Sequence, residues 1–191
     1  MKKSVLMLSL ALASNFAWAA AGTPEDAVKT TIGKLMDILK GANQQQKVRS
    51  LCSLVKSDLD TGSIGTVLLG NYQSLASDPE GIRNFKATVP SIIMDQFYGL
   101  LHDKGGAEFS IGGTVPKGSG KTGVKVVIAG SNFVVTVLRA SNKIVDVEWN
   151  NFSLVNTKRD EFQRDLGGFN TDKPVTALVE RLHANGVDKC N

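Results

Sequence analysis

Residues 121–149 read KTGVKVVIAGSNFVVTVLRASNKIVDVEW, and their pattern decides the fold class. Apolar and polar side chains alternate with a period of two, which is typical of half-buried strands, and a similar run precedes this stretch. The predicted strands are residues 108–114, 121–129, 132–139 and 143–149. Gly130-Ser131 and Ser141-Asn142 are joints short enough to connect neighbouring antiparallel strands. The pattern therefore predicts a curved, four-stranded antiparallel sheet with one apolar face.

The residues on either side of this sheet repeat their apolar side chains at helical spacing. Thr23-Pro24-Glu25-Asp26 and Ser77-Asp78-Pro79-Glu80 are typical helix starts, since each supplies an N-cap oxygen, a first-turn proline and acidic side chains at the positive end of the helix dipole. The predicted helices run from Thr23 to Gly41 and over residues 44–59, 64–69, 79–101, 154–166 and 173–185. Pro90 lies inside the fourth helix, where we expect a kink or a break. The chain is therefore expected to be α+β, with helices packed on one face of the sheet.

Residues 1–19 have the pattern of a secretory signal peptide. Lys2 and Lys3 precede an apolar run, and Ala17-Trp18-Ala19 is a small-residue cleavage site. A transmembrane anchor is the alternative, but the apolar run is shorter than the roughly 20 residues that span a bilayer. We expect cleavage after Ala19 and export of a single domain, residues 20–191, because no repeat or low-complexity linker divides it.

The composition excludes several classes of protein. The formal net charge of +4 is spread along the chain and only 6% of residues are aromatic, so neither a basic patch nor a stacking platform for nucleic acid is expected. The two cysteines and two histidines are too few for a zinc framework of ordinary spacing. Because an exported domain folds in an oxidising compartment, we favour a disulfide between Cys52 and Cys190, with two unpaired thiols as the alternative. His102 and His183 lie near predicted helix ends, where a ring nitrogen can bond terminal carbonyls.

Asp146 and Glu148 share one face of the last predicted strand. Paired carboxylates can divide acid and base roles in catalysis. We favour a structural interpretation instead, a solvated face or ion pairs with Lys125 or Arg139 on neighbouring strands. No nucleophile motif of the Gly-x-Ser-x-Gly type is present, and we expect no enzyme.

The stretch VDVEWNNFSLV at residues 145–155 continues through Arg159 to Glu161-Phe162. It resembles the strand-to-helix signature of the MlaC-type periplasmic lipid carriers, also called the toluene-tolerance or auxiliary ABC-transport family. Asn151 stands where the family has a turn glycine, and asparagine tolerates the left-handed conformation that such a turn requires. Asp146 and Arg159 match polar positions of the family, and we interpret them as structural or partner-facing.

A second stretch, LLGNY at residues 68–72, is followed by Pro79 and Phe85 and resembles the Leu-Gly-x-Tyr segment of the same family. Gln73 stands where the family often has a tryptophan. Together with the signal peptide and the order of elements, the resemblance covers the whole exported domain.

The resemblance implies an apolar cavity between the helices and the sheet, and a carrier that holds the acyl chains of glycerophospholipids there. About 30 acyl methylenes at about 0.8 kcal/mol each would cost some 25 kcal/mol to expose to water, so a carrier must bury them. The implied partners are an inner-membrane ABC transporter complex with a membrane-anchored substrate-binding subunit, and an outer-membrane lipoprotein–porin complex. The implied location is the periplasm of a Gram-negative bacterium, with no cofactor, metal or nucleic acid.

Thirteen apolar or aromatic residues are the candidates for contact with lipid. Those on the matched segments are Leu69, Tyr72, Val147, Trp149 and Phe152. Those added from the apolar pattern are Ile93, Phe97, Leu101, Val126, Ile128, Phe133, Val135 and Val137. For each of them ordinary core packing is the alternative role.

Three other functions remain open on the sequence. The chain could carry another apolar lipid, such as a hopanoid or a sterol-like molecule. It could be a secreted enzyme on a cone-shaped scaffold of helices and sheet, using Asp146 or His102 inside an apolar cavity. It could also be an interaction module whose interior is fully packed.

Overall fold

The computed structural model describes residues 22–190, and the signal peptide predicted at residues 1–19 lies outside the described residues. The helices are α1 (Pro24–Lys40), α2 (Gln44–Asp58), α3 (Thr61–Leu69), α4 (Pro79–Leu101), α5 (Leu154–Gly168) and α6 (Pro174–Ala184), with short 3-10 helices η1 (Gly70–Ser74) and η2 (His102–Lys104). The strands are β1 (Phe109–Pro116), β2 (Lys121–Ile128), β3 (Ser131–Leu138), β4 (Ile144–Trp149) and β5 (Phe152–Ser153). The fold is α+β, as predicted.

The sheet has five strands in the order β1-β2-β3-β4-β5, and each neighbouring pair is antiparallel. The prediction of four strands was therefore wrong by one short strand. β5 is only two residues long, Phe152 opposite Trp149 and Ser153 opposite Glu148, and two residues are too few to show a period in the sequence.

One face of the sheet is buried and the other faces solvent. On β2, Val124, Val126 and Ile128 are buried while the intervening Lys125 is exposed. A bulge between β3 and β4 interrupts this alternation, because Thr136 pairs with Asp146 while the next residue, Val137, pairs with Ile144. The predicted face of β4 is wrong at this point: Ile144, and not Val145, shares the core-facing side with Val147.

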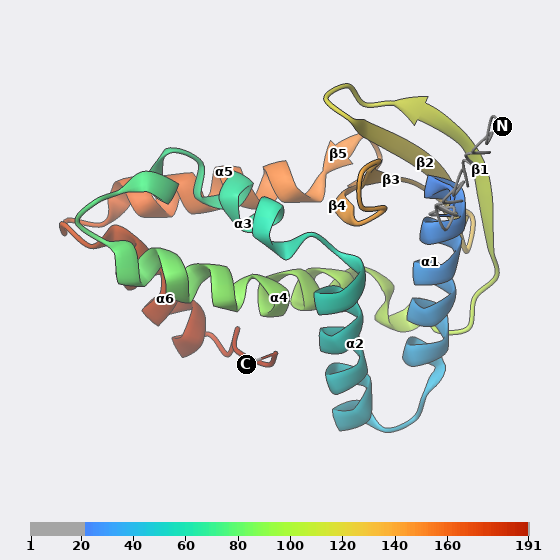
Figure 1. Ribbon diagram of the computed structural model, residues 1–191. Helices are drawn as coiled ribbons and strands as arrows, with labels where there is room; N and C mark the ends of the chain where they lie inside the picture. Colours follow the sequence, from blue (N-terminus) through green and yellow to red (C-terminus); the bar gives the residue numbers. More distant parts are fainter. Residues whose placement is uncertain (1–21, 191) are drawn as a thin grey trace, which may run out of the picture.

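The helices cover only the buried face and extend well beyond the sheet (Figure 1). α1 packs on the sheet, and α2 packs between α1 and α4. The N-terminal part of α4 extends away from the sheet, beside α3, α5 and α6. α4 continues through Pro90 as one helix of 23 residues, so no break occurs there. Where α4 and α5 meet, the rings of Phe85 and Phe162 pack edge to face with their centroids 5.6 Å apart.

Polar side chains fix the ends of the helices. Thr23 and Asp26 form a reciprocal capping box at the start of α1, which satisfies two otherwise unpaired N–H groups. Asp78 caps α4 and also reaches α6: its carboxylate accepts hydrogen bonds from the Thr176 backbone at 2.8 Å and the Thr176 hydroxyl at 2.6 Å. Burial acts to raise the pKa of Asp78, but these bonds and that from Gly81 outweigh it and hold the pKa below its ordinary value.

Over residues 22–190, no helix combines the length and the apolar character that a membrane span requires.

Candidate functional site

A small cavity lies between the buried face of the sheet and helices α1, α2 and α4. Its volume is about 30 Å³, about the volume of one water molecule. The helices contribute Thr31, Ile32, Leu35, Leu51, Leu54, Val55, Met94, Phe97, Leu100, Leu101 and Leu154. The remaining lining residues are Leu59, Ile128, Phe133, Val135, Ile144 and Val147. Since every residue but Thr31 is apolar, the cavity suits a hydrocarbon group and offers no acid, base or nucleophile to a substrate.

The polar residue of the lining is already bonded to other protein groups. The Thr31 hydroxyl donates to Asp58 at 2.9 Å, and the Lys34 ammonium binds the same carboxylate oxygen at 3.0 Å. Burial acts to raise the pKa of Asp58, but hydrogen bonds from Ser57, Lys34 and Thr31 prevail and lower it. The cluster ties α1 to α2 along one edge of the cavity.

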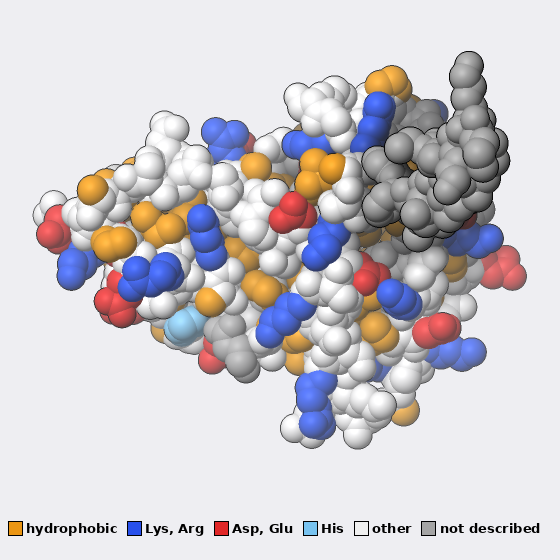
Figure 2. Space-filling view, viewed as in Figure 1, with side chains coloured by type: hydrophobic (Ala, Val, Ile, Leu, Met, Phe, Trp, Pro, Cys, Tyr) orange, Lys and Arg blue, Asp and Glu red, His pale blue; other side chains and the backbone are white. Residues whose placement is uncertain are grey.

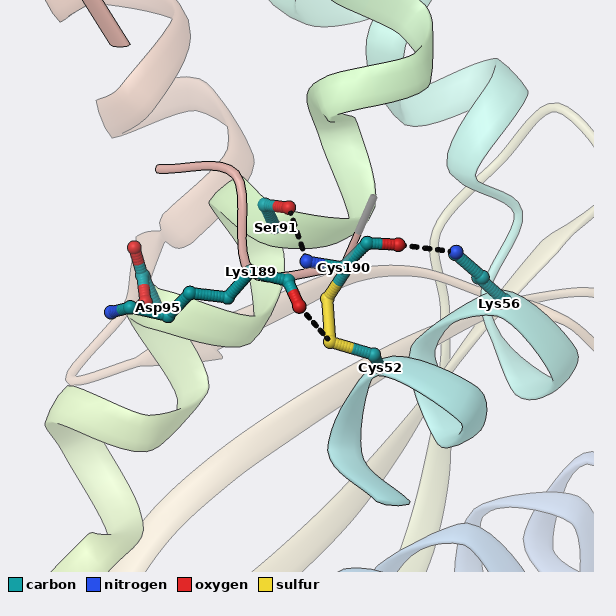
Figure 3. Close-up of a disulfide and its surroundings, with 6 residues drawn as sticks. All are labelled: Cys52, Lys56, Ser91, Asp95, Lys189 and Cys190. Carbon is teal, nitrogen blue, oxygen red and sulfur yellow. Dashed lines mark hydrogen bonds and ion pairs between the residues drawn. A yellow bond between two sulfur atoms is a disulfide. The ribbon is translucent and has the colours of Figure 1, made fainter. Parts of the chain in front are cut away.

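A disulfide links the α2 wall of this cavity to the C-terminal segment (Figure 3). Cys52 and Cys190 are bonded with their Cα atoms 5.2 Å apart, and Cys52 precedes the lining residues Leu54 and Val55 by less than one helical turn. The segment is also held to α4, because the Cys190 backbone N–H donates to the Ser91 hydroxyl at 2.9 Å. The cavity wall on α2 is therefore joined covalently to the C-terminal segment and, through it, to the middle of α4.

The structure brings six of the thirteen candidate residues together around the cavity. These are Phe97, Leu101, Ile128, Phe133, Val135 and Val147. Leu69, Ile93, Val126 and Val137 are buried in the core outside the lining, and Tyr72 is half-buried. Trp149 and Phe152 are exposed at the end of the sheet. Whether any of them contacts a lipid stays a prediction.

The sequence did not single out the contributions of α1 and α2 to the cavity. Ile32, Leu35, Leu51 and Leu54 belong to apolar stripes at helical spacing, which were visible in the sequence. A stripe of this kind looks the same whether it packs against a core or surrounds a cavity. The missing information was which stripe faces which across the sheet.

The carboxylates of β4 have structural partners. Glu148 forms an ion pair with Lys117 at 2.6 Å. The expected partner was Lys125 or Arg139, and that prediction was wrong for Glu148. The pairing depends on where the β1–β2 hairpin ends, which the sequence does not specify.

Asp146 joins β4 to α5, since its carboxylate accepts the backbone N–H groups of Val147 at 2.8 Å and Val155 at 3.2 Å. Burial raises the pKa of Asp146, and the neighbouring charge of Glu148 adds to the rise. Its position within the sheet fits a role in holding the start of α5.

The two histidines differ from each other. The His102 ring nitrogen Nδ1 lies 3.1 Å from the Tyr98 carbonyl at the end of α4, as predicted. His183 Nε2 instead lies 3.4 Å from the Thr88 hydroxyl, so the expected bond to terminal carbonyls was wrong for His183. Among residues 22–190 no group of three or more His, Cys, Asp or Glu is placed to hold a metal ion.

Charges of both signs are interspersed over the surface seen in Figure 2. On this face blue Lys and Arg side chains are more numerous than red Asp and Glu side chains, and the two kinds are scattered among each other. A surface of this kind differs from the clustered positive charge that nucleic-acid binding requires.

These features define a class: an α+β domain that encloses an apolar cavity between an antiparallel sheet and a helical layer. The chain belongs to the MlaC family, since the family described as "MlaC protein" matches residues 28–183. The family resemblance found in the two sequence segments is thereby confirmed.

A solved structure has a similar fold. It is the phospholipid-binding protein from Ralstonia solanacearum in complex with a phospholipid, with a TM-score of 0.68 and 15% sequence identity. The similarity covers 86% of this chain and 98% of the Ralstonia chain. No curated protein matches the sequence.

Proposed function

We propose that this protein is a periplasmic carrier that binds glycerophospholipid by its acyl chains in the cavity between the sheet and α1, α2 and α4. The observation that carries the proposal is the lining of that cavity, which is apolar at every position except the bonded Thr31. Membership of the MlaC family and the similarity to a phospholipid-binding protein support it.

The carrier would move lipid between an inner-membrane ABC transporter complex and an outer-membrane lipoprotein–porin complex. Family membership supports these partners and the periplasmic location. The chain itself would need no nucleotide or cofactor, because burial of the acyl chains supplies the binding energy and ATP would act in the transporter.

Binding would require the cavity walls to separate. A methylene group is about as large as a water molecule, about 30 Å³, so one acyl chain of about sixteen carbons needs on the order of 500 Å³. The cavity of about 30 Å³ is far smaller. The layer of helices and the sheet would therefore move apart as the chain enters.

A matched pair of substitutions tests the proposal. Val135 lines the cavity, whereas Val134 beside it pairs with Lys125 and Glu148 on the opposite face of the sheet. Val135→Phe is expected to lower lipid affinity about tenfold, because keeping two methylenes out of the cavity forgoes about 0.8 kcal/mol each. Val134→Phe should bind as the original chain does.

The readout is native mass spectrometry of protein purified from bacterial periplasm, followed by lipid extraction and uptake from phospholipid vesicles. Circular dichroism confirms that both variants fold, since the added ring costs Val135→Phe about 1–3 kcal/mol of stability. Protein that carries no lipid and takes none from vesicles contradicts the proposal. A bound hopanoid or sterol-like molecule in place of phospholipid would redirect it to that ligand.

A further inference from the structure

The cavity lies closest to the surface at one part of its wall. Four of its lining residues are partly exposed, whereas the others are buried. The four are Phe97 and Leu100 in the last turns of α4, Val147 in β4 and Leu154 at the start of α5. The thin part of the wall is therefore bounded by the end of α4 and by the segment that runs from β4 into α5.

Two exposed aromatic side chains continue this part of the wall to the surface. Trp149 is 40% exposed and Phe152 is 72% exposed. Trp149 pairs with the lining residue Phe133 on β3 and with Phe152 on β5. Because directly opposed residues of antiparallel strands share a face, both rings lie on the cavity side of the sheet.

The backbone holds these two rings in place. Asn150 and Asn151 both have positive φ, 50° and 65°, as in the tight two-residue turns that connect antiparallel strands. Asp146 fixes the following helix through its bond to the Val155 N–H at 3.2 Å. The exposure of Trp149 and Phe152 is therefore a consequence of paired strands and a defined turn.

We propose that Phe97, Leu100, Trp149 and Phe152, the apolar rim, form the entrance through which a phospholipid acyl chain passes into the cavity. The proposal rests on the proposed function. The rim is the place where the apolar lining reaches the surface. At the lining residue Thr31 the wall instead carries the Lys34–Asp58 ion pair, and the lining residues of α1 and α2 are buried. The acyl chain would enter methyl end first, and its carboxyl end would remain beside Trp149.

Trp149 itself reports on this arrangement. The two tryptophans are Trp18 and Trp149, and the predicted cleavage after Ala19 removes Trp18, so Trp149 is the single fluorescent indole of residues 20–191. Protein of residues 20–191 is incubated with vesicles of phosphatidylcholine brominated either near the carboxyl end or near the methyl end of the acyl chain, and then separated from them. Bromine near the carboxyl end is expected to quench the tryptophan more strongly. Equal quenching, quenching only by the methyl end, or no quenching with lipid bound overturns the entrance.

The rate of uptake gives a second test with a matched control. Phe152→Ala should slow uptake from protein-free vesicles about tenfold, the size of effect seen when one aromatic anchor is removed, with little change in the final amount bound. Val67, 38% exposed on α3, is the control, and Val67→Ala should take up lipid at the original rate. An unchanged rate in Phe152→Ala overturns the proposal and favours a surface for a protein partner. A chain that binds no lipid at all refutes the proposed function instead.

Discussion

Replacing Cys52 and Cys190 together by serine is expected to lower the free energy of unfolding by about 2–5 kcal/mol. The bond spans a sequence separation of 138 residues. For a loop of that length the chain-entropy relation gives about 5 kcal/mol, and strain or residual structure in the unfolded chain reduces the value. Because a domain of this kind is stable by only about 5–15 kcal/mol, the loss is a large share of the total.

Other contacts of the C-terminal segment do not replace the disulfide. Lys189 binds Asp95 at 2.9 Å, but this ion pair is about half exposed on the lysine side, and such pairs contribute about 0–1 kcal/mol. Lys189→Ala is therefore a suitable control, with an expected loss below about 1 kcal/mol.

The assay is urea unfolding with and without reductant, followed by circular dichroism. Reductant should lower the midpoint of the original chain to that of the double serine variant and leave the variant unchanged. The reasoning is refuted if the double variant loses no more stability than Lys189→Ala does. In that case the disulfide would not be what restrains the unfolded chain.

Two further predictions concern the packing of α4 and the acidic pH range. Gly81→Ala should lower Tm by about 2–8 °C, because the added methyl group would lie 2.5 Å from the Thr176 backbone nitrogen. Gly99→Ala in the same helix is the control. Its methyl group would meet nothing within 4 Å, so this variant should be neutral or stabilising. Calorimetry of the two variants decides, and equal Tm values would contradict the close packing. For Asp146, whose folded-state pKa lies above 3.8, stability should fall as pH rises from about 3.8 through that pKa, and Asp146→Asn should lose this decline. Asp78 has a lowered pKa, so its contribution is complete above 3.8 and is lost as pH falls below it. Urea midpoints between pH 3 and 7 measure both effects, and a variant profile parallel to the original would refute the assignment to Asp146.

The features that the sequence predicted well are encoded locally. Thr23 and Asp78 were recognised as helix starts because an N-cap side chain bonds N–H groups within the same turn. The four longer strands were recognised because alternation is a property of consecutive residues. The family resemblance was also local, since it depended on two short segments.

The features that the sequence did not predict depend on pairing across the molecule. The bulge at Val145 places Ile144, and not Val145, on the same side of β4 as Val147, and a bulge is defined only against the partner strand. Leu69 was a candidate for the cavity, but α3 packs along α5, where Gln163 donates to the Leu69 carbonyl at 2.9 Å. The lining residues of α2 were not singled out for the same reason, because their partners lie on β3, β4 and α4.

The small volume of the cavity is what stability requires of a carrier with this lining. A permanent cavity large enough for one acyl chain, on the order of 500 Å³, would cost about 12 kcal/mol at about 24 cal/mol per Å³. That cost is comparable with the whole stability of a domain, about 5–15 kcal/mol. A chain that buries Leu35, Leu54 and Val135 around a cavity of only about 30 Å³ avoids most of this cost. The acyl methylenes, at about 0.8 kcal/mol each, would offset it only when lipid replaces those contacts. A nearly closed apolar interior is therefore compatible with lipid carriage, provided that the helices and the sheet can separate.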